Sequence, residues 1–323
     1  MKIHILDDWF DSLRHLPCFE KLQDHDVTIW NDHISDIDIL ANRLQQAECL
    51  VLFRERTKIT KPLLDKLPKL KLISQRSVYP HIDVDACTQN GVLLCSNMHK
   101  DSASMATVEH VWALILATMR QLPQQMQSLQ QGNWQMGVGR TLHGRILGLY
   151  GYGRIAKEVA RIADAFGMKV VWWASDDGRV RALNDGQHIA SSRKEFFATP
   201  DIISLHVRLK PSTQHIITSD DFKYMRNDSI FVNTSRAGLI APNALLDGLN
   251  KGKPQMAAID VFDIEPITWQ NDSLATHPNV IATPHIGFVS NDEYNIQFAD
   301  IFDQIIAYAT GRPIHMVNPE IWK

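Results

Sequence analysis

Long apolar runs, closely spaced cysteines and an excess of one charge are all missing from this 323-residue chain. Its longest apolar run covers residues 111–117 and is far shorter than the roughly 20 residues that a membrane-spanning helix needs. Asp7 and Asp8 come too early for a signal-peptide core to form. We therefore expect a soluble, cytoplasmic protein with no membrane partner.

The charge balance and the cysteine spacing exclude further classes. The chain has 33 Lys and Arg against 36 Asp and Glu, a net charge of −3, and no basic run stands out. This predicts no nucleic-acid partner. No C-x-x-C spacing occurs, which argues against a zinc ribbon or a thioredoxin-type site, and no metal is expected. Buried thiols in a reducing compartment are expected at Cys18, Cys49, Cys87 and Cys95.

The chain is longer than one compact core usually needs, which predicts two domains. Short β-branched runs alternate with helical patterns, which is typical of α/β domains with parallel sheets. The expected strands are 2–6, 26–30, 49–53, 70–74, 92–95, 145–150, 169–173, 202–206, 229–233 and 256–261. An amphipathic stretch to about residue 22 separates the first two strands. The expected helices are 35–46, 61–67, 103–119, 154–166 and 291–309.

The residue pattern changes near Asp101, and we place the boundary between the domains there. The polar side chains of residues 101–104 can cap the helix that follows. The last helix is too little for a third domain, so we expect it to pack back on the first. This gives a split domain of residues 1–100 with 288–323, and a second domain of residues 101–287. The most loop-like segments are 130–140 and then 176–186.

Residues 147–156 contain an apolar strand that runs into a G-x-G-x-x-A turn and a helix. Gly151 permits the tight turn, Gly153 lets a pyrophosphate approach the backbone, and Ala156 lets the helix pack close to the strand. Amides at the helix start would face the anion. A turn that merely needs small residues is the alternative. The strand that follows at 170–173 favours dinucleotide binding.

The choice between NAD and NADP is usually made at the end of that second strand, where an acid accepts from the ribose hydroxyls. Here Ser175 stands at this place, followed by Asp176 and Asp177. The two aspartates disfavour a 2′-phosphate, whereas Arg179 and Arg181 would offset them if the loop folded back. We predict NAD, with NADP as the alternative.

Three further candidates lie in segments at strand ends of the second domain: Arg236, Glu265 and His285. The carboxyl ends of parallel strands line the ligand crevice, so a cation, an acid and a titratable base would converge beside the nicotinamide. Taken singly, each residue also fits a surface ion pair or a solvated loop. Their order downstream of a dinucleotide turn favours a catalytic site.

With these motifs in place, the chain closely resembles the D-isomer-specific 2-hydroxyacid dehydrogenase family over nearly its whole length. The resemblance rests on the glycine turn, on segments 201–206, 211–217, 233–238 and 260–266, and on the Pro284–His285 pair. It implies a split, flavodoxin-like catalytic domain hinged to a Rossmann-type NAD(P)-binding domain. It also implies a homodimer built largely through the cofactor domain.

For activity, the resemblance implies hydride transfer between NAD(P) and C2 of a small 2-hydroxy or 2-keto acid. Arg236 would hold the substrate carboxylate with a planar, permanently charged fork. His285 would exchange the hydroxyl proton, and Glu265 would accept from its other ring nitrogen. The cofactor-binding residues that it implies are Gly151, Gly153, Arg154, Ile155, Ser175, His206, Val207, Thr213, Thr234, Ser235, Arg236 and Asp260. His206 also fits a satisfied strand-end histidine, and Asp260 a capping acid.

One segment departs from the family pattern. Members usually carry a glycine-rich loop just before residue 82, whose amides grip the substrate carboxylate, but residues 74–81 contain no glycine. The loop either contacts substrate through new side chains or is rebuilt without a contact role. The candidate substrate residues are Arg76, Ser77 and Val78. Together with Arg54, Arg56 and Arg208, a cation there would favour a dianionic or phosphorylated acid.

A different class of function stays open on the same fold. Non-catalytic, NAD(H)-sensing corepressors resemble these enzymes, and the altered loop at Arg76 keeps that alternative alive. Arg236, Glu265 and His285 together favour an enzyme. A formate dehydrogenase is disfavoured, because that branch uses glutamine where this chain has Glu265.

Overall fold

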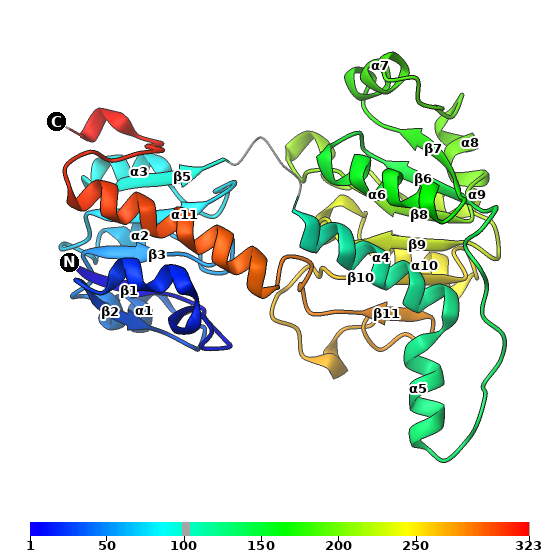
Figure 1. The fold of residues 1–323 in the computed structure, drawn as a ribbon, viewed down its shortest axis with the longest axis horizontal. Helices are drawn as coiled ribbons and strands as arrows, with labels where there is room; N and C mark the ends of the chain where they lie inside the picture. Colours follow the sequence, from blue (N-terminus) through cyan, green and yellow to red (C-terminus); the bar gives the residue numbers. More distant parts are fainter. Residues whose placement is uncertain (99–103, 323) are drawn as a thin grey trace. The chain divides into compact units, whose positions relative to one another are not determined.

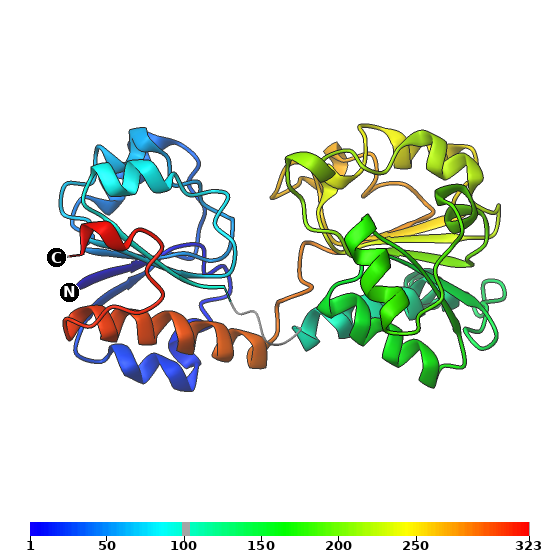
Figure 2. The ribbon, with the colours of Figure 1, turned by 90° about the horizontal axis from the view of Figure 1, so that it is seen from above.

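The computed structural model describes residues 1–98 and 104–322 and divides the chain into two compact units. Unit 1 comprises Met1–Ser102 with Val289–Lys323, and unit 2 comprises Ala103–Phe288. Each unit is a parallel sheet with helices on both faces (Figures 1 and 2), which confirms the α/β class. No helix among residues 1–98 and 104–322 has both the length and the apolar character that a membrane crossing requires.

The sheet of unit 1 has the strand order β2-β1-β3-β4-β5, the flavodoxin-like order. Its strands are β1 (Lys2–Ile5), β2 (Asp26–Ile29), β3 (Cys49–Val51), β4 (Leu72–Arg76) and β5 (Leu93–Asn97). One face carries α1 (Ile37–Leu44), α2 (Lys61–Leu64) and α3 (Val84–Gln89); the other carries α11 (Asn291–Ala309) and a 3₁₀ helix, Pro17–Leu22 (Figure 2). A 3₁₀ turn, Leu13–His15, precedes it, so 3₁₀ turns take the place of the long amphipathic segment expected there.

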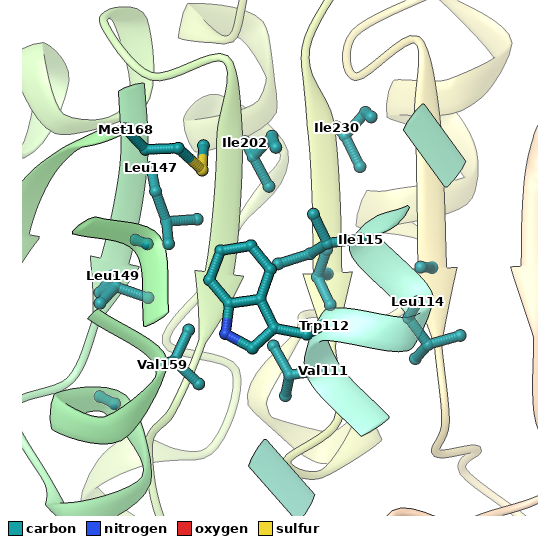
Figure 3. Packing of buried hydrophobic residues seen from close by; sticks show 14 of the residues in the cluster. Val111, Trp112, Leu114, Ile115, Leu147, Leu149, Val159, Met168, Ile202 and Ile230 are labelled. Carbon is teal, nitrogen blue, oxygen red and sulfur yellow. The ribbon is translucent and has the colours of Figure 1, made fainter. Parts of the chain in front are cut away.

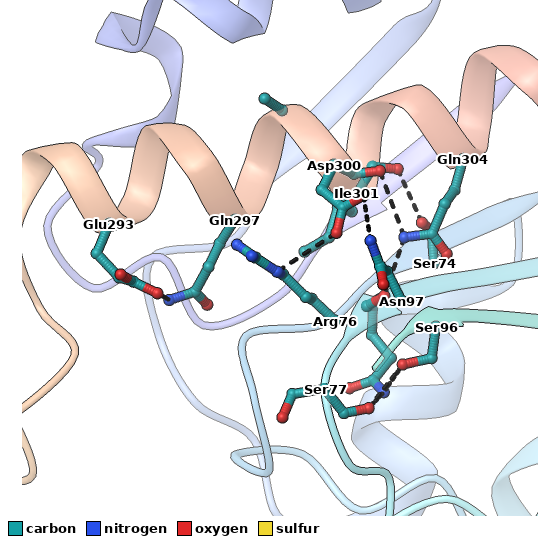
Figure 4. Close-up of polar contacts among 12 residues, drawn as sticks. Ser74, Arg76, Ser77, Ser96, Asn97, Glu293, Gln297, Asp300, Ile301 and Gln304 are labelled. Atoms are coloured by element: carbon teal, nitrogen blue, oxygen red, sulfur yellow. Dashed lines mark hydrogen bonds and ion pairs between the residues drawn. The ribbon is translucent and has the colours of Figure 1, made fainter. Parts of the chain in front are cut away.

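Helix α11 is tied to the sheet of unit 1 by polar as well as apolar contacts (Figure 4). The Ser74 hydroxyl donates to the carbonyl oxygen of Ile301 at 2.8 Å, and Gln304 Nε2 donates to the carbonyl oxygen of Gln75 at 3.1 Å. Its apolar face buries Phe298, with Ile301, Phe302 and Ile305 beside it. The last helix is therefore part of the core of unit 1.

The sheet of unit 2 has the order β11-β10-β9-β8-β6-β7. Its strands are β6 (Ile146–Tyr150), β7 (Lys169–Trp173), β8 (Ile202–Leu205), β9 (Ile230–Asn233), β10 (Met256–Ile259) and β11 (Val280–Ala282). One face carries α4 (Met105–Arg120) and α6 (Arg154–Ala165); the other carries α8 (Arg193–Ala198), α9 (Ser219–Tyr224) and α10 (Ala244–Asn250). The strand order reverses between β6 and β8, and such a switch point is where open α/β sheets bind ligands.

A large apolar cluster fixes α4 and α6 on the sheet of unit 2. Trp112 of α4 lies among Leu147, Val159 and Ile202 in Figure 3, and its ring centroid is 4.9 Å from that of Phe166. Of the segment expected to cap α4, residues 101–103 lie outside the described residues. Ser104 does cap α4, because its Oγ accepts from an amide of the first turn at 3.4 Å.

Of the two segments expected to be loops, one is helical and one is irregular. Residues 176–186 were expected as a loop, but Asp176–Asn184 form α7. Ser175 caps this helix and two aspartates occupy its first turn, where they favour the helix dipole. Residues 131–140 are irregular, as expected, and follow α5 (Leu122–Gln130), which extends away from the sheet (Figure 1).

Candidate active site

The glycine turn lies at the switch point of unit 2, between β6 and α6. Gly151 has φ +116°, and its amide donates to the carbonyl oxygen of Trp173 at 2.7 Å. A Cβ at this position would collide with the carbonyl oxygen of His206, so the packing of the strand ends demands glycine. Ala156 is fully buried, which lets α6 approach the sheet.

Gly153 is required for a different reason. It is the N-cap of α6 with φ −108°, and a Cβ there would meet no protein atom within 4 Å. No side chain caps the helix, and the first amides of a helix have no acceptor within it. Arg154, which is exposed, and Ile155, which is half-buried, open this helix. An open cradle beside a helix N-terminus fits a pyrophosphate, so these residues fit a dinucleotide.

Ser175 stands at the end of β7 and caps α7 through its Oγ, which accepts from an amide of the first turn at 3.3 Å. Asp176 and Asp177 are exposed beside it. Arg179 forms an ion pair with Asp176, and its guanidinium lies 4.5 Å from the centre of the Trp173 ring. The segment is therefore a helix in which this arginine is paired with Asp176, and not a loop that folds back.

The residues after β8 border the glycine turn from the other side. The ring Nε2 of His206 lies 2.9 Å from Ser204 Oγ, and burial lowers the pKa of His206 to about 4. His206 is therefore a neutral, hydrogen-bonded histidine near pH 7, which matches the alternative drawn from the sequence. The side chain of Val207 faces Gly151. The hydroxyl of Thr213 is engaged within its own turn, where it accepts from the Lys210 amide at 2.9 Å.

Arg236 follows β9, and the chain around it is fixed by Asn233. The buried Asn233 side chain accepts from the Ser235 amide at 3.0 Å and donates to the carbonyl oxygen of Arg236 at 3.1 Å. Ser235 Oγ donates to the carbonyl oxygen of Leu205 at 2.7 Å. Arg236 and its neighbour Thr234 are both half-buried, and Arg236 Nη1 donates to the carbonyl oxygen of Ser235 at 2.7 Å.

Glu265 and His285 are in direct contact. His285 Nδ1 lies 2.6 Å from Glu265 Oε2, and the other oxygen of Glu265 accepts from the Phe262 amide at 2.9 Å. Both side chains remain about a third exposed. Glu265 follows β10, His285 follows β11 and Arg236 follows β9, three neighbouring strands of one sheet. The predicted pair therefore meets, and the predicted cation lies at the same sheet edge.

Asp260 also follows β10, but its carboxylate is buried and accepts hydrogen bonds from the segment that carries His285. Only 1% of it is exposed. It accepts from Thr283 Oγ1 at 2.6 Å and from the amides of Ile286 at 2.9 Å and Gly287 at 2.8 Å. Its carboxylate thus fixes the turn that carries His285, as a capping acid does.

In unit 1, the candidate substrate loop at Ser77 is held by side chains of β4 and β5. Ser77 has φ +79°, and its carbonyl oxygen accepts from Gln75 Nε2 at 3.0 Å and Ser96 Oγ at 2.7 Å. These bonds hold a conformation for which glycine is the usual choice. Val78, which follows, is half-buried. Side-chain hydrogen bonds thus stabilise a positive φ at Ser77 in a loop that has no glycine.

Arg76 does not supply the open cation that the sequence suggested. Its side chain is 5% exposed and runs toward α11, where Nε lies 3.3 Å from Asp300 Oδ2 (Figure 4). Arg56 is likewise engaged within unit 1: Nη1 donates to the carbonyl oxygen of Asp7 at 2.7 Å, and its guanidinium lies 3.9 Å from the centre of the Trp9 ring. Arg208 is exposed on unit 2.

Sequence reasoning missed Asn233, although it named the segment that begins there. The available signal was an amide side chain at the last position of an otherwise apolar strand, where its polar atoms must find partners. Gln75 and Ser96, which are the next-to-last residues of β4 and β5, are buried polar side chains of the same kind of position.

Comparisons with known proteins point to one family. The family model described as D-isomer specific 2-hydroxyacid dehydrogenase, NAD binding domain, matches residues 112–287. The D-3-phosphoglycerate dehydrogenase of Methanocaldococcus jannaschii is 35% identical over 269 residues, covering 82% of this chain and 50% of that protein. The glyoxylate reductase of Thermococcus litoralis is 30% identical over 312 residues, covering 92% of both chains.

The chain thus spans about half the length of that phosphoglycerate dehydrogenase and nearly all of that glyoxylate reductase. Among solved structures, the phosphoglycerate oxidoreductase from Vibrio cholerae O395 has a TM-score of 0.91 and 43% identity, covering 96% of this chain and 99% of that one. With a family model over more than half of its length and relatives of this similarity, the chain belongs to the D-isomer specific 2-hydroxyacid dehydrogenase family.

Proposed function

We propose that this protein transfers a hydride between NAD(H) and C2 of a small 2-hydroxy or 2-keto acid. The observation that carries the proposal is the His285–Glu265 contact at the edge of a sheet whose glycine turn leaves an open dinucleotide cradle. Family membership supports it, as does the glyoxylate reductase that matches over nearly the whole chain, because glyoxylate is a 2-oxo acid.

When bound, NAD(H) supplies the hydride acceptor or donor at the nicotinamide ring. Because Nδ1 of His285 faces Glu265, Nε2 is the ring nitrogen that exchanges a proton with substrate. During reduction of a keto acid, Nε2–H gives its proton to the C2 oxygen; during oxidation, Nε2 takes the hydroxyl proton. Glu265 keeps the ring in this orientation and stabilises its protonated form.

Glu265 can orient His285 because the carboxylate is itself held. Its Oε1 accepts from the Phe262 amide, which aims Oε2 at the imidazole. Arg236 binds the substrate carboxylate through two parallel hydrogen bonds and polarises the C2 oxygen. Asn233 fixes the backbone from which Arg236 extends, so the cation is placed before substrate arrives.

For the cofactor, we favour NAD over NADP. Asp176 and Asp177 are exposed beside Ser175 and would repel a 2′-phosphate. Arg179 is paired with Asp176 and lies on Trp173, so it offsets the charge of Asp176 and leaves that of Asp177 to repel the phosphate. For the substrate, we favour an unphosphorylated acid, because Arg56 and Arg76 are engaged within unit 1.

We also propose that the protein is a homodimer. Helix α5 buries none of its residues, and Leu122, Met126 and Leu129 form an exposed stripe along it. Beyond the helix, Trp134 is 77% and Val138 is 90% exposed. Residues 122–139, which we call the arm, contain no charged residue. An uncharged apolar surface can meet its own copy without like-charge repulsion.

The activity is tested by following NADH oxidation with glyoxylate, hydroxypyruvate, 3-phosphohydroxypyruvate and a panel of larger 2-keto acids. We expect substrate-dependent oxidation, faster with NADH than with NADPH. His285→Ala should lower kcat by roughly 10²- to 10⁴-fold while NADH affinity, measured by fluorescence, stays nearly unchanged. NADH binding with no oxidation by any acid at any pH would favour the non-catalytic sensor instead.

A further inference from the structure

The turn that carries His285 has an unusual backbone and a single buried anchor. His285 has φ +54°, a conformation that residues with a side chain rarely adopt. Asp260 holds the chain on both sides of it, through the Thr283 hydroxyl before it and the amides of Ile286 and Gly287 after it. The position of the imidazole therefore depends on how firmly Asp260 is fixed.

Asp260 is contacted from outside the turn by His110 of α4. His110 Nε2 lies 3.0 Å from Thr283 Oγ1 and 3.2 Å from Asp260 Oδ1, and the histidine is 14% exposed. Because the one hydroxyl proton of Thr283 is donated to Asp260, Thr283 Oγ1 must accept from His110 Nε2–H. His110 therefore links helix α4 to the strand end that leads to His285.

The sequence leaves room for this close approach. A Cβ at position 287 would lie 3.0 Å from Asp260 Oδ2 and 3.5 Å from His110 Cδ2. Gly287 thus lets the turn close over both the carboxylate and the imidazole. Burial raises the pKa of Asp260, but the hydrogen bonds from His110 and Thr283 outweigh it, so the net pKa lies below its ordinary value.

We propose that His110 is a positioning residue for the reaction: it fixes Asp260 and Thr283, and through them holds His285 at the place where it exchanges its proton. The inference rests on the proposed function. Without the Nε2–H donor, the hold on the two amides after His285 loosens and the imidazole moves. A displacement of about 1 Å at a reacting group can lower a rate by 10²-fold.

The test compares His110→Leu, which removes the donor, with His110→Gln, whose Nε2–H is the same number of bonds from the backbone. We expect His110→Leu to lower kcat by about 10- to 100-fold with NADH affinity within about 3-fold of the parent, and His110→Gln to restore most of the loss. His188→Leu, which replaces an exposed histidine of the same unit, is the control and should match the parent.

A second measurement separates positioning from general stability. In a His285→Ala background, His110→Leu should cause no further loss of kcat, because no imidazole is left to position. Thr283→Val should behave like His110→Leu and Thr283→Ser like the parent. An unchanged kcat in His110→Leu, or equal losses in both backgrounds, would overturn the proposal. If none of the keto acids causes the parent to oxidise NADH, it is the proposed function that fails.

Discussion

Arg236 carries a charge that lysine also has, but in a shape that lysine lacks. A guanidinium gives a carboxylate two parallel hydrogen bonds, whereas an ammonium is a point charge on a flexible chain. We expect Arg236→Lys to lower kcat/KM for the keto acid by roughly 10- to 100-fold, the worth of one charged hydrogen bond. Steady-state kinetics measure this. A variant that performs like the parent would mean that the carboxylate is held elsewhere.

His81 makes the stability of the folded protein depend on pH. Both of its ring nitrogens are buried, with no hydrogen-bond partner among the described residues, and burial lowers its pKa to about 4 from its ordinary 6.5. Below pH 6.5 the unfolded chain gains a proton that the folded chain refuses, so stability is full above pH 6.5 and falls progressively toward pH 4. The loss is about 3 kcal/mol at most.

We therefore expect His81→Leu to be as stable as the parent at pH 7.5 or more so, because an unpaired polar group is removed from the interior. It should lose less stability than the parent on going to pH 5. Thermal melts of both proteins at the two pH values measure the difference. Equal losses in Tm would contradict the assignment to His81.

The meeting of Glu265 with His285 could be predicted, because parallel strands end at one edge of a sheet and both residues follow such strands. The role of Asn233 could not, since it depends on which backbone groups fold back onto its side chain, and for Asp260 the sequence left a cofactor-binding role and a capping role open. For the loop at Arg76, the sequence left open whether its side chains contact substrate. The burial of Arg76 could not be predicted, because it pairs with Asp300 of α11, more than 200 positions away.

At the scale of elements, the glycine turn offers a matched pair of variants. Gly151→Ala should destabilise the fold strongly, because its Cβ would collide with a carbonyl oxygen. Gly153→Ala should cost no more than about 1 kcal/mol, since its Cβ meets no protein atom, yet it should weaken NADH binding by filling the cradle. Thermal melts and NADH titrations separate the two effects. Parent-like NADH affinity in Gly153→Ala would contradict the cradle.

The order of ten strands and of five helices followed from the sequence, because β-branched runs and amphipathic stretches differ in period. Strand β11 and helices α3, α5, α8, α9 and α10 were not predicted; each is only three to nine residues long. Several strands begin or end one or two residues away from expectation. For example, β4 and β5 each end two residues later, because their polar last residues also pair with each other. Helix α7 was missed because its composition, with two aspartates and a glycine, resembles a loop. Its cap and its close packing of Gly178 on Ala174 appear only in the structure.

For the whole molecule, the arm predicts the state of association. We expect the parent to run at twice the mass of one chain by light scattering, and Trp134→Glu together with Val138→Glu to shift it toward the monomer, because both residues are exposed and apolar. Val180→Glu, an exposed apolar residue of α7 outside the arm, is the control and should stay dimeric. A parent that runs as a monomer would contradict the homodimer.

Helix α11 also sets an order of events during synthesis. The strands of unit 1 leave the ribosome first, but the helix that covers one face of their sheet is encoded only after all of unit 2. Until then Leu72, on the sheet face where Ser74 meets α11, lacks in the nascent chain the cover that the finished protein supplies. Unit 2 is continuous and can close as soon as residue 288 has emerged, so unit 1, whose first segment precedes unit 2 in the chain, is completed after it.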